Sequence, residues 1–123
     1  MSNVSNDLVS GVLNLEYDAE NNRIELTCEL SPNDPAVVQM YRLGMVIREG
    51  SLVYAFSNTG LSSNTEDASG GTWSASSYAG NIGESDQDRT FNGLVQGSVF
   101  RDGEAEDFTF GISLTIEAAT LAA

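Results

Sequence analysis

The residues that could carry out chemistry in this chain are almost all carboxylates. The sequence has 18 Asp and Glu residues, no His and one cysteine, and its five cationic side chains are all arginine. Because His and Lys are missing, the usual bases that activate a Ser or Cys nucleophile are missing too. The sequence also has no Gly-x-Ser-x-Gly elbow, no phosphate-binding loop and no dinucleotide-binding glycine pattern. We therefore predict that the protein is not an enzyme and takes no cofactor.

Calcium is the one metal that these residue types allow, since zinc and copper sites need His or several Cys ligands. Asp86, Asp88 and Asn92 offer oxygen ligands at spacings similar to those of an EF-type loop. Phe91 stands where such a loop needs its early glycine, and no closing glutamate follows at the right distance. Paired carboxylates can also hydrolyse glycosides, but the acidic pairs here cluster in turns. Solvated turns are the favoured interpretation, and a structural calcium ion on Asp86, Asp88 and Asn92 is the alternative.

The net charge of −13 bears on the possible partners. Nucleic-acid binding depends on clustered positive charge, so we expect no direct nucleic-acid binding and no binding to anionic membranes. An acidic surface is compatible with high solubility, a saline setting, a basic partner, or a surface that DNA passes without sticking. The first residues have neither a basic segment nor an apolar core, and no stretch approaches transmembrane length, so we expect no signal peptide and no membrane span.

The lone Cys28 excludes an internal disulfide. It lies on the apolar side of an alternating run at residues 24–30, so we predict a buried structural thiol.

The elements that must position these residues are predicted to be β-strands. The clearest lies at residues 107–117, where Phe108, Phe110, Ile112, Leu114 and Ile116 alternate with polar or small residues and so form one apolar face. Further strands are expected at residues 8–17, 24–30, 45–49, 52–57, 72–79 and 90–101. An apolar face of this length needs a second layer to cover it. We therefore predict a mainly β fold, either an antiparallel β-sandwich or a partly open barrel.

Local signals refine this prediction. Asp34 suits a helix N-cap, Pro35 the first helical position and Gly44 the end, so one short helix is predicted at residues 35–43. Glycine first in the pair Gly50-Ser51 predicts a type II′ hairpin. Residues 1–7 are small and polar and predict a flexible arm, which leaves residues 8–123 as a single β-sandwich domain.

Glycines and aromatics suggest where other groups come close. Gly93 and Gly97 lie on one face of the strand at residues 90–101 and predict a bend, a bulge or a close approach by another backbone. Most aromatic residues fall in predicted elements and are assigned to the core. Trp73 beside two glycines is a candidate anchor for a partner. We group it with Tyr78 and with Leu61, in a long polar loop at residues 58–71, as candidate interface residues.

The last third of the chain resembles a known class of proteins. Residues 91–100, the Asp102-Gly103 turn and residues 107–116 are similar to the closing strands of small β-sandwich virion proteins of tailed viruses, namely tail-tube and head-decoration subunits. The resemblance implies a non-enzymatic subunit that is assembled in the host cytoplasm, resides in the virion, and binds copies of itself and other virion proteins. Tail-tube subunits form rings from a sandwich with one helix, and their bore is commonly acidic. No long inter-subunit hairpin is evident here, so tube and decoration roles both stay open, and no functional residue is carried over.

Physical reasoning points to assembly as well, because edge strands, polar loops and flexible ends are useful where neighbouring subunits cover them. Three other classes are weighed against this one. A fimbrial or surface-adhesion subunit would be expected to carry a signal peptide. An acidic inhibitor that mimics DNA would space its carboxylates like phosphates on one face and bind a basic enzyme. A ligand-binding sandwich would have a pocket beside Trp73 or the long loop.

Overall fold

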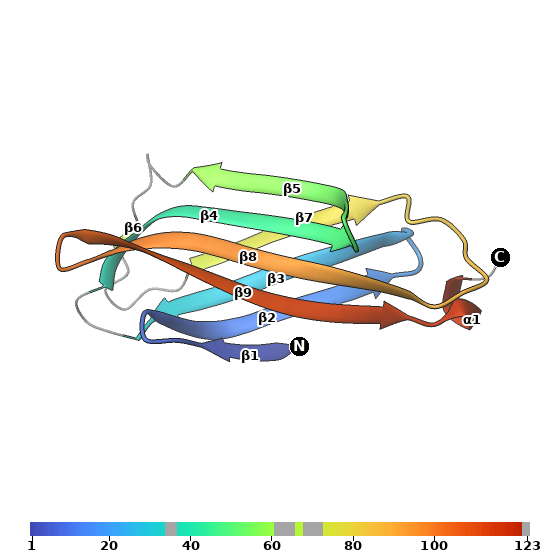
Figure 1. The fold of residues 1–123 in the computed structure, drawn as a ribbon, viewed down its shortest axis with the longest axis horizontal. Helices are drawn as coiled ribbons and strands as arrows, with labels where there is room; N and C mark the ends of the chain where they lie inside the picture. Colours follow the sequence, from blue (N-terminus) through green and yellow to red (C-terminus); the bar gives the residue numbers. More distant parts are fainter. Residues whose placement is uncertain (34–36, 61–65, 68–72, 122–123) are drawn as a thin grey trace.

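Two antiparallel sheets pack face to face in the computed structural model, which describes residues 1–33, 37–60, 66–67 and 73–121 (Figure 1). Sheet A has the strand order β1-β2-β3-β7, and sheet B has the order β5-β4-β8-β9, with β6 also paired to β4. The strands of sheet A are β1 (Ser2–Ser5), β2 (Val9–Asp18), β3 (Arg23–Pro32) and β7 (Trp73–Gly80). Those of sheet B are β4 (Val37–Glu49), β5 (Leu52–Gly60), β6 (Glu66–Asp67), β8 (Arg89–Arg101) and β9 (Glu104–Ile116). The short helix α1 (Ala118–Leu121) follows β9.

This architecture confirms the prediction of a mainly β fold with antiparallel sheets in a sandwich; the sheets do not close into a barrel. The buried apolar residues of both sheets form one cluster. Cys28, Phe91 and Val95 all lie in it, as their places in the alternating runs predict.

The predicted helix at residues 35–43 is wrong for the part that the structure describes, because residues 37–43 lie in β4; residues 35 and 36 are outside the described ranges. This segment pairs with β8, from Val37 opposite Arg101 to Leu43 opposite Gly97. Such long-range pairing outweighs a local capping signal, and the β-branched pair Val37-Val38 favours a strand. The short helix is instead α1, and no helix among the described residues is long and apolar enough to cross a membrane.

The prediction of a flexible arm at residues 1–7 is wrong for residues 2–5, which form β1 and pair antiparallel with β2. Asn6 shapes the turn between these strands. Its side-chain oxygen accepts hydrogen bonds from the backbone N–H groups of Leu8 and Val9, both at 2.8 Å. A side chain that replaces a backbone partner in this way is a recurrent way to stabilise a turn.

The alternation predicted at the C-terminal end is confirmed in β9. Phe108 and Ile116 are buried, whereas Phe110, Ile112 and Leu114 are half-buried and pack against the core. β9 is an edge strand of sheet B, so its apolar side is covered less completely at the middle than a central strand would be.

The two glycines of β8 mark a close approach, but by side chains rather than by the other backbone that was one of the predicted causes. A Cβ atom on Gly93 would lie 2.8 Å from Leu26 Cδ1, in the opposite sheet. A Cβ atom on Gly97 would overlap the ring of Phe108, on the neighbouring strand. Because the glycines have no Cβ atom, they leave space for two buried side chains to pack against β8.

Candidate interaction surface

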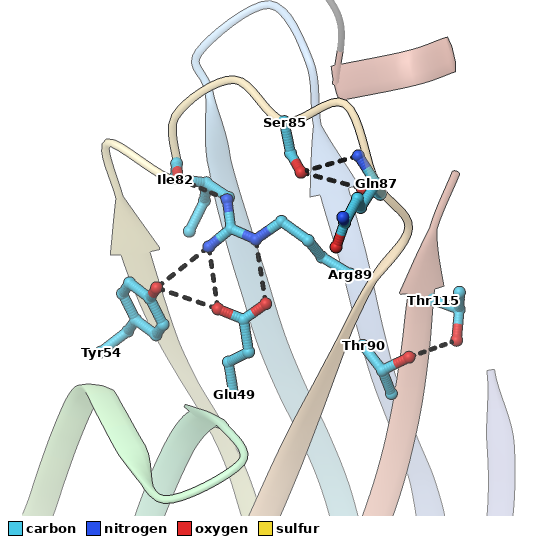
Figure 2. Close-up of polar contacts among 8 residues, drawn as sticks. All are labelled: Glu49, Tyr54, Ile82, Ser85, Gln87, Arg89, Thr90 and Thr115. Carbon is cyan, nitrogen blue, oxygen red and sulfur yellow. Dashed lines mark hydrogen bonds and ion pairs between the residues drawn. The ribbon is translucent and has the colours of Figure 1, made fainter. Parts of the chain in front are cut away.

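A cluster of polar side chains joins one end of sheet B to the loop before β8 (Figure 2). Arg89 donates from Nε to Glu49 Oε2 and from Nη2 to Glu49 Oε1, both at 2.9 Å. It also donates to the carbonyl oxygen of Ile82 at 2.7 Å and to the hydroxyl of Tyr54 at 3.0 Å. Tyr54 in turn donates to Glu49 Oε1 at 3.1 Å. We call Arg89, Glu49 and Tyr54 the arginine clamp.

The electrostatics of the arginine clamp are those of a satisfied structural pair. Hydrogen bonds from Arg89 hold the pKa of Glu49 below its ordinary value of 4.5, and the same bonds raise the pKa of Arg89. The guanidinium also lies 5.0 Å from the centroid of the Phe91 ring. A carboxylate whose charged form is stabilised in this way is a poor general acid or base near neutral pH. The clamp therefore holds structure together.

The clamp positions the start of the edge strand β5. Val53 lies opposite Arg48 and Ala55 opposite Ile47, so Tyr54 is the extra residue of a β-bulge. Tyr54 and Ala55 both pack against the core, and the Tyr54 ring lies 5.7 Å from that of Phe91. After the bulge, side chains again alternate between the two sides of the sheet. Because Ala55 points inward, Phe56 lies on the outer side of the sheet.

The hairpin that leads into β5 has the predicted geometry. Its loop is the pair Gly50-Ser51, since Glu49 lies opposite Leu52. Gly50 has a φ of 58°, whereas Ser51 does not have a positive φ. Positive φ at the first central residue alone is the signature of a type II′ turn.

The outward side of sheet B carries few charges. We define the B outer face by the outward residues of its four long strands, which share cross-strand rows. They are Val53 and Phe56 of β5; Arg42, Gly44, Val46 and Arg48 of β4; Asn92, Leu94, Gln96 and Ser98 of β8; and Asp107, Thr109, Gly111 and Ser113 of β9. Only one of these residues, Asp107, is a carboxylate. In a chain with 18 carboxylates, this face is set apart by charge.

An apolar row crosses the middle of the B outer face. Phe56 lies opposite Val46, Val46 opposite Leu94, and Leu94 opposite Gly111. The Phe56 side chain is 70% exposed, and Val53 on the same strand is 52% exposed. Large apolar groups gathered on the solvent side of a sheet are characteristic of contact surfaces.

The strand at the margin of this face has no charged residue. Residues 52–60 read Leu-Val-Tyr-Ala-Phe-Ser-Asn-Thr-Gly and contain no Pro, Lys, Arg, Asp or Glu. Proteins that stay monomeric usually protect an edge strand with such residues, because its free backbone groups can pair with another chain. β5 is at the edge of sheet B and has none of these side-chain protections.

The arginines divide into two groups. Arg23, Arg89 and Arg101 each form ion pairs within the chain. Arg42 and Arg48 form no ion pair with any residue that the structure describes, and both are exposed on the B outer face. The two arginines without an ion-pair partner among the described residues thus lie on the face that also carries the apolar row.

The structure corrects the prediction for Trp73 and leaves two others as predictions. Trp73 is only 4% exposed and belongs to the core, because the first residue of β7 faces sheet B rather than solvent. Tyr78, on the same strand, is 63% exposed, and its ring lies 5.2 Å from the guanidinium carbon of Arg23. Leu61 lies outside the described residues.

The three residues considered for calcium make no hydrogen bond to one another, and two of them bond to different partners. Asp88 Oδ1 accepts a hydrogen bond of 2.8 Å from the backbone N–H of Ala118, at the start of α1. Asn92 Oδ1 accepts one of 2.7 Å from the Ser113 hydroxyl, and Asp86 is exposed. No group of three or more His, Cys, Asp or Glu residues in the described ranges could hold a metal ion.

Cys28 is buried, as predicted, with 2% of its surface exposed. Desolvation by burial raises the pKa of its thiol to about 11. A thiol of that pKa is almost entirely protonated near neutral pH and is therefore a weak nucleophile. Cys28 therefore contributes to the fold as a core residue of β3.

No protein-family model matches this chain, and no curated protein matches it either. The resemblance to virion proteins therefore stays a prediction.

The candidate contact residues of the B outer face were missed by sequence reasoning, which favoured Trp73. The sequence offered only a partial signal: residues 52–60 carry no charged side chain, but neither do residues 68–83 and 90–100. The sequence could not show that Phe56, Val46 and Leu94 share a row, because strand register depends on the bulge at Tyr54 and on pairing with β8.

Proposed function

We propose that this protein is a non-enzymatic structural subunit that acts by self-assembly, in a viral or phage-like particle of the tail-tube or capsid-decoration type. One observation carries the proposal: in a strongly acidic molecule, the B outer face combines an exposed apolar row, a single carboxylate and two arginines that have no ion-pair partner in the described part of the chain. Such a face is unfavourable in a free monomer and becomes favourable when another subunit covers it. Its partners would be other copies of this chain and other virion proteins.

Two further observations support a structural role. The best-formed polar cluster, the arginine clamp, has its hydrogen bonds satisfied within the protein and positions an edge strand. The buried Cys28 thiol is protonated at neutral pH. Both groups contribute to the fold, and the acidic remainder of the surface would let DNA pass without adhering, as a tube or shell requires.

The test of this proposal is the assembly state of the purified chain. We expect the mass measured by light scattering to rise with protein concentration, and negative-stain images to show rings, tubes or other symmetric particles. A chain that stays monomeric at all concentrations up to about 1 mM, where even weak specific contacts form, would refute the proposal.

A second candidate is an acidic inhibitor that mimics DNA. It is favoured by three glutamates, Glu16, Glu25 and Glu29, which lie on the outward side of sheet A. This candidate predicts a stable monomer that binds a basic nucleic-acid-binding protein in a fixed ratio and is displaced by duplex DNA.

A further inference from the structure

The outward side of sheet A has a charge opposite to that of the B outer face. We define the A outer face by the outward residues of β2, β3 and β7, which share cross-strand rows. They are Val12, Asn14, Glu16 and Asp18 of β2; Arg23, Glu25, Thr27 and Glu29 of β3; and Ser74, Ser76 and Tyr78 of β7. Four are carboxylates and one is a cation, whereas the B outer face has two cations and one carboxylate.

Part of the negative charge on the A outer face is not neutralised by any ion pair among the described residues. Glu16 lies directly opposite Glu25, an arrangement in which like charges destabilise a sheet. Arg23 pairs with Glu25 at 2.6 Å, but Glu16 and Glu29 form no ion pair with any described residue. A cation supplied from outside would relieve this repulsion.

The A outer face is also hollowed. A shallow groove of about 540 Å³ lies over β2, β3 and β7, and Met1, Val12, Thr27, Glu29 and Ser74 are among the residues that line it. Val12 and Glu29 are direct cross-strand partners, so the groove sets an apolar side chain beside a carboxylate. The B outer face sets an apolar side chain, Phe56, one row away from a cation, Arg48.

We propose that the B outer face of one copy docks on the A outer face of the next, with Phe56 against the groove and Arg48 paired with Glu29. The partner that docks there is a second copy of this chain, because the two faces are complementary. The exposed apolar groups of the B outer face match the partly apolar groove of the A outer face. The arginines of the B outer face match Glu16 and Glu29 of the A outer face, and neither set has an ion-pair partner among the described residues. The inference rests on the proposed function, since it names the surfaces through which self-assembly would proceed.

The two faces belong to opposite layers of the sandwich (Figure 1). A contact that joins two different surfaces of identical subunits is heterologous, and it repeats until a ring closes or a filament grows. The proposal thus predicts rings or filaments and excludes an assembly that stops at a two-fold dimer.

Charge reversal tests the pairing directly. We expect Arg48→Glu and Glu29→Arg, each alone, to raise the concentration at half-assembly at least about tenfold, because like charges then face one another. An equimolar mixture of the two variants should assemble close to the wild-type concentration, since each reversed face then meets a matching one. The double variant R48E/E29R should recover assembly for the same reason.

Two variants complete the design. Phe56→Ser should raise the concentration at half-assembly, because it removes the apolar side chain that docks in the groove. Glu84→Arg is the control for Glu29→Arg: it makes the same charge change at an exposed position in the loop before β8, and it should leave assembly within about twofold of wild type. Circular dichroism spectra and melting curves would establish that every variant is folded.

The outcomes separate the two proposals. Wild-type assembly that neither single reversal weakens, or that the mixture fails to restore, overturns the docking model while leaving self-assembly intact. Assembly that ends at a dimer also overturns it. A wild-type chain that never assembles refutes the proposed function itself.

Discussion

At the scale of single residues, the arginines show how one side-chain type takes two roles. Arg89 is largely buried, with 15% of its side chain exposed, and its donors meet a carboxylate, a hydroxyl and a carbonyl group. Arg48 is exposed and has no partner among the described residues. Burial with full pairing makes the first residue a contributor to stability, whereas exposure leaves the second available for contact.

We expect Arg89→Gln to lower the free energy of unfolding by about 2 kcal/mol, because hydrogen bonds to a charged group are removed and Glu49 loses its cationic partner. The measurement is urea unfolding at pH 7, under conditions where the protein is monomeric. Arg23→Gln is the matched control: that ion pair is 37% exposed on both sides, so the loss should stay below about 1 kcal/mol. Equal losses for the two variants would contradict the role given to the clamp.

The lowered pKa of Glu49 also predicts a pH dependence. Because the carboxyl group loses its proton more readily in the folded state than in the unfolded state, its contribution to stability is complete above the ordinary value of 4.5 and is lost as the pH falls through the lower folded value. The stability difference between wild type and Glu49→Gln should therefore narrow between pH 6 and pH 3. Urea unfolding of both proteins across this range measures it, and a difference that is constant or widens toward pH 3 would disprove the assignment.

At the scale of the elements, strand β8 links the core to the B outer face. Its inward side carries Phe91, Val95 and Val99 with two glycines between them, and its outward side carries Leu94 in the apolar row. The same strand thus sets the spacing between the sheets and the register of the contact surface.

We expect Gly93→Ala to destabilise the fold by about 1–3 kcal/mol, because the added Cβ atom would lie 2.8 Å from Leu26 Cδ1 in a fully buried site. Thermal unfolding followed by circular dichroism measures the effect. In the same sheet, Gly111→Ala is the control, since its Cβ atom would meet nothing closer than 3.4 Å; we expect a change within about 0.5 kcal/mol.

Shortening the opposing side chain tests the cause of this effect. If the close approach is responsible, Leu26→Val should cost less in the Gly93→Ala background than in wild type, which a double-mutant cycle detects. Strictly additive effects would show that Leu26 is not the obstacle.

At the scale of the whole molecule, the net charge of −13 opposes association of identical copies at long range. The proposed docking surfaces would act only at contact. Salt screens the long-range repulsion, since the Debye length falls from about 30 Å at 0.01 M to about 8 Å at 0.15 M ionic strength. Added salt thus favours association by weakening the repulsion between subunits, and opposes it by weakening the ion pairs at the contact.

We expect the concentration at half-assembly to fall when NaCl is raised from 10 to 150 mM, because repulsion between whole subunits involves many more charges than the contact pairs do. Sedimentation velocity at a series of protein concentrations measures it. A rise over this range would indicate that ion pairs at the contact outweigh the net charge. Phe56→Ser should keep the same salt response as wild type, since it changes no charge.

The fold class and most strand positions could be predicted from the sequence alone, because the alternation of apolar and polar side chains is a local property that shows which side of each strand is buried in a two-layer sandwich. Alternation predicted the strand at residues 107–117 and the burial of Cys28. A separate local signal, glycine at the first loop position, predicted the Gly50-Ser51 hairpin. The three-dimensional structure was needed to show that residues 37–43 form a strand, because pairing with β8 overrides the capping signal at Asp34 and Pro35. It was also needed to show which face carries the candidate contact. The row from Phe56 to Gly111 joins residues far apart in the chain, and their register is set by a bulge and by long-range pairing that no local pattern encodes.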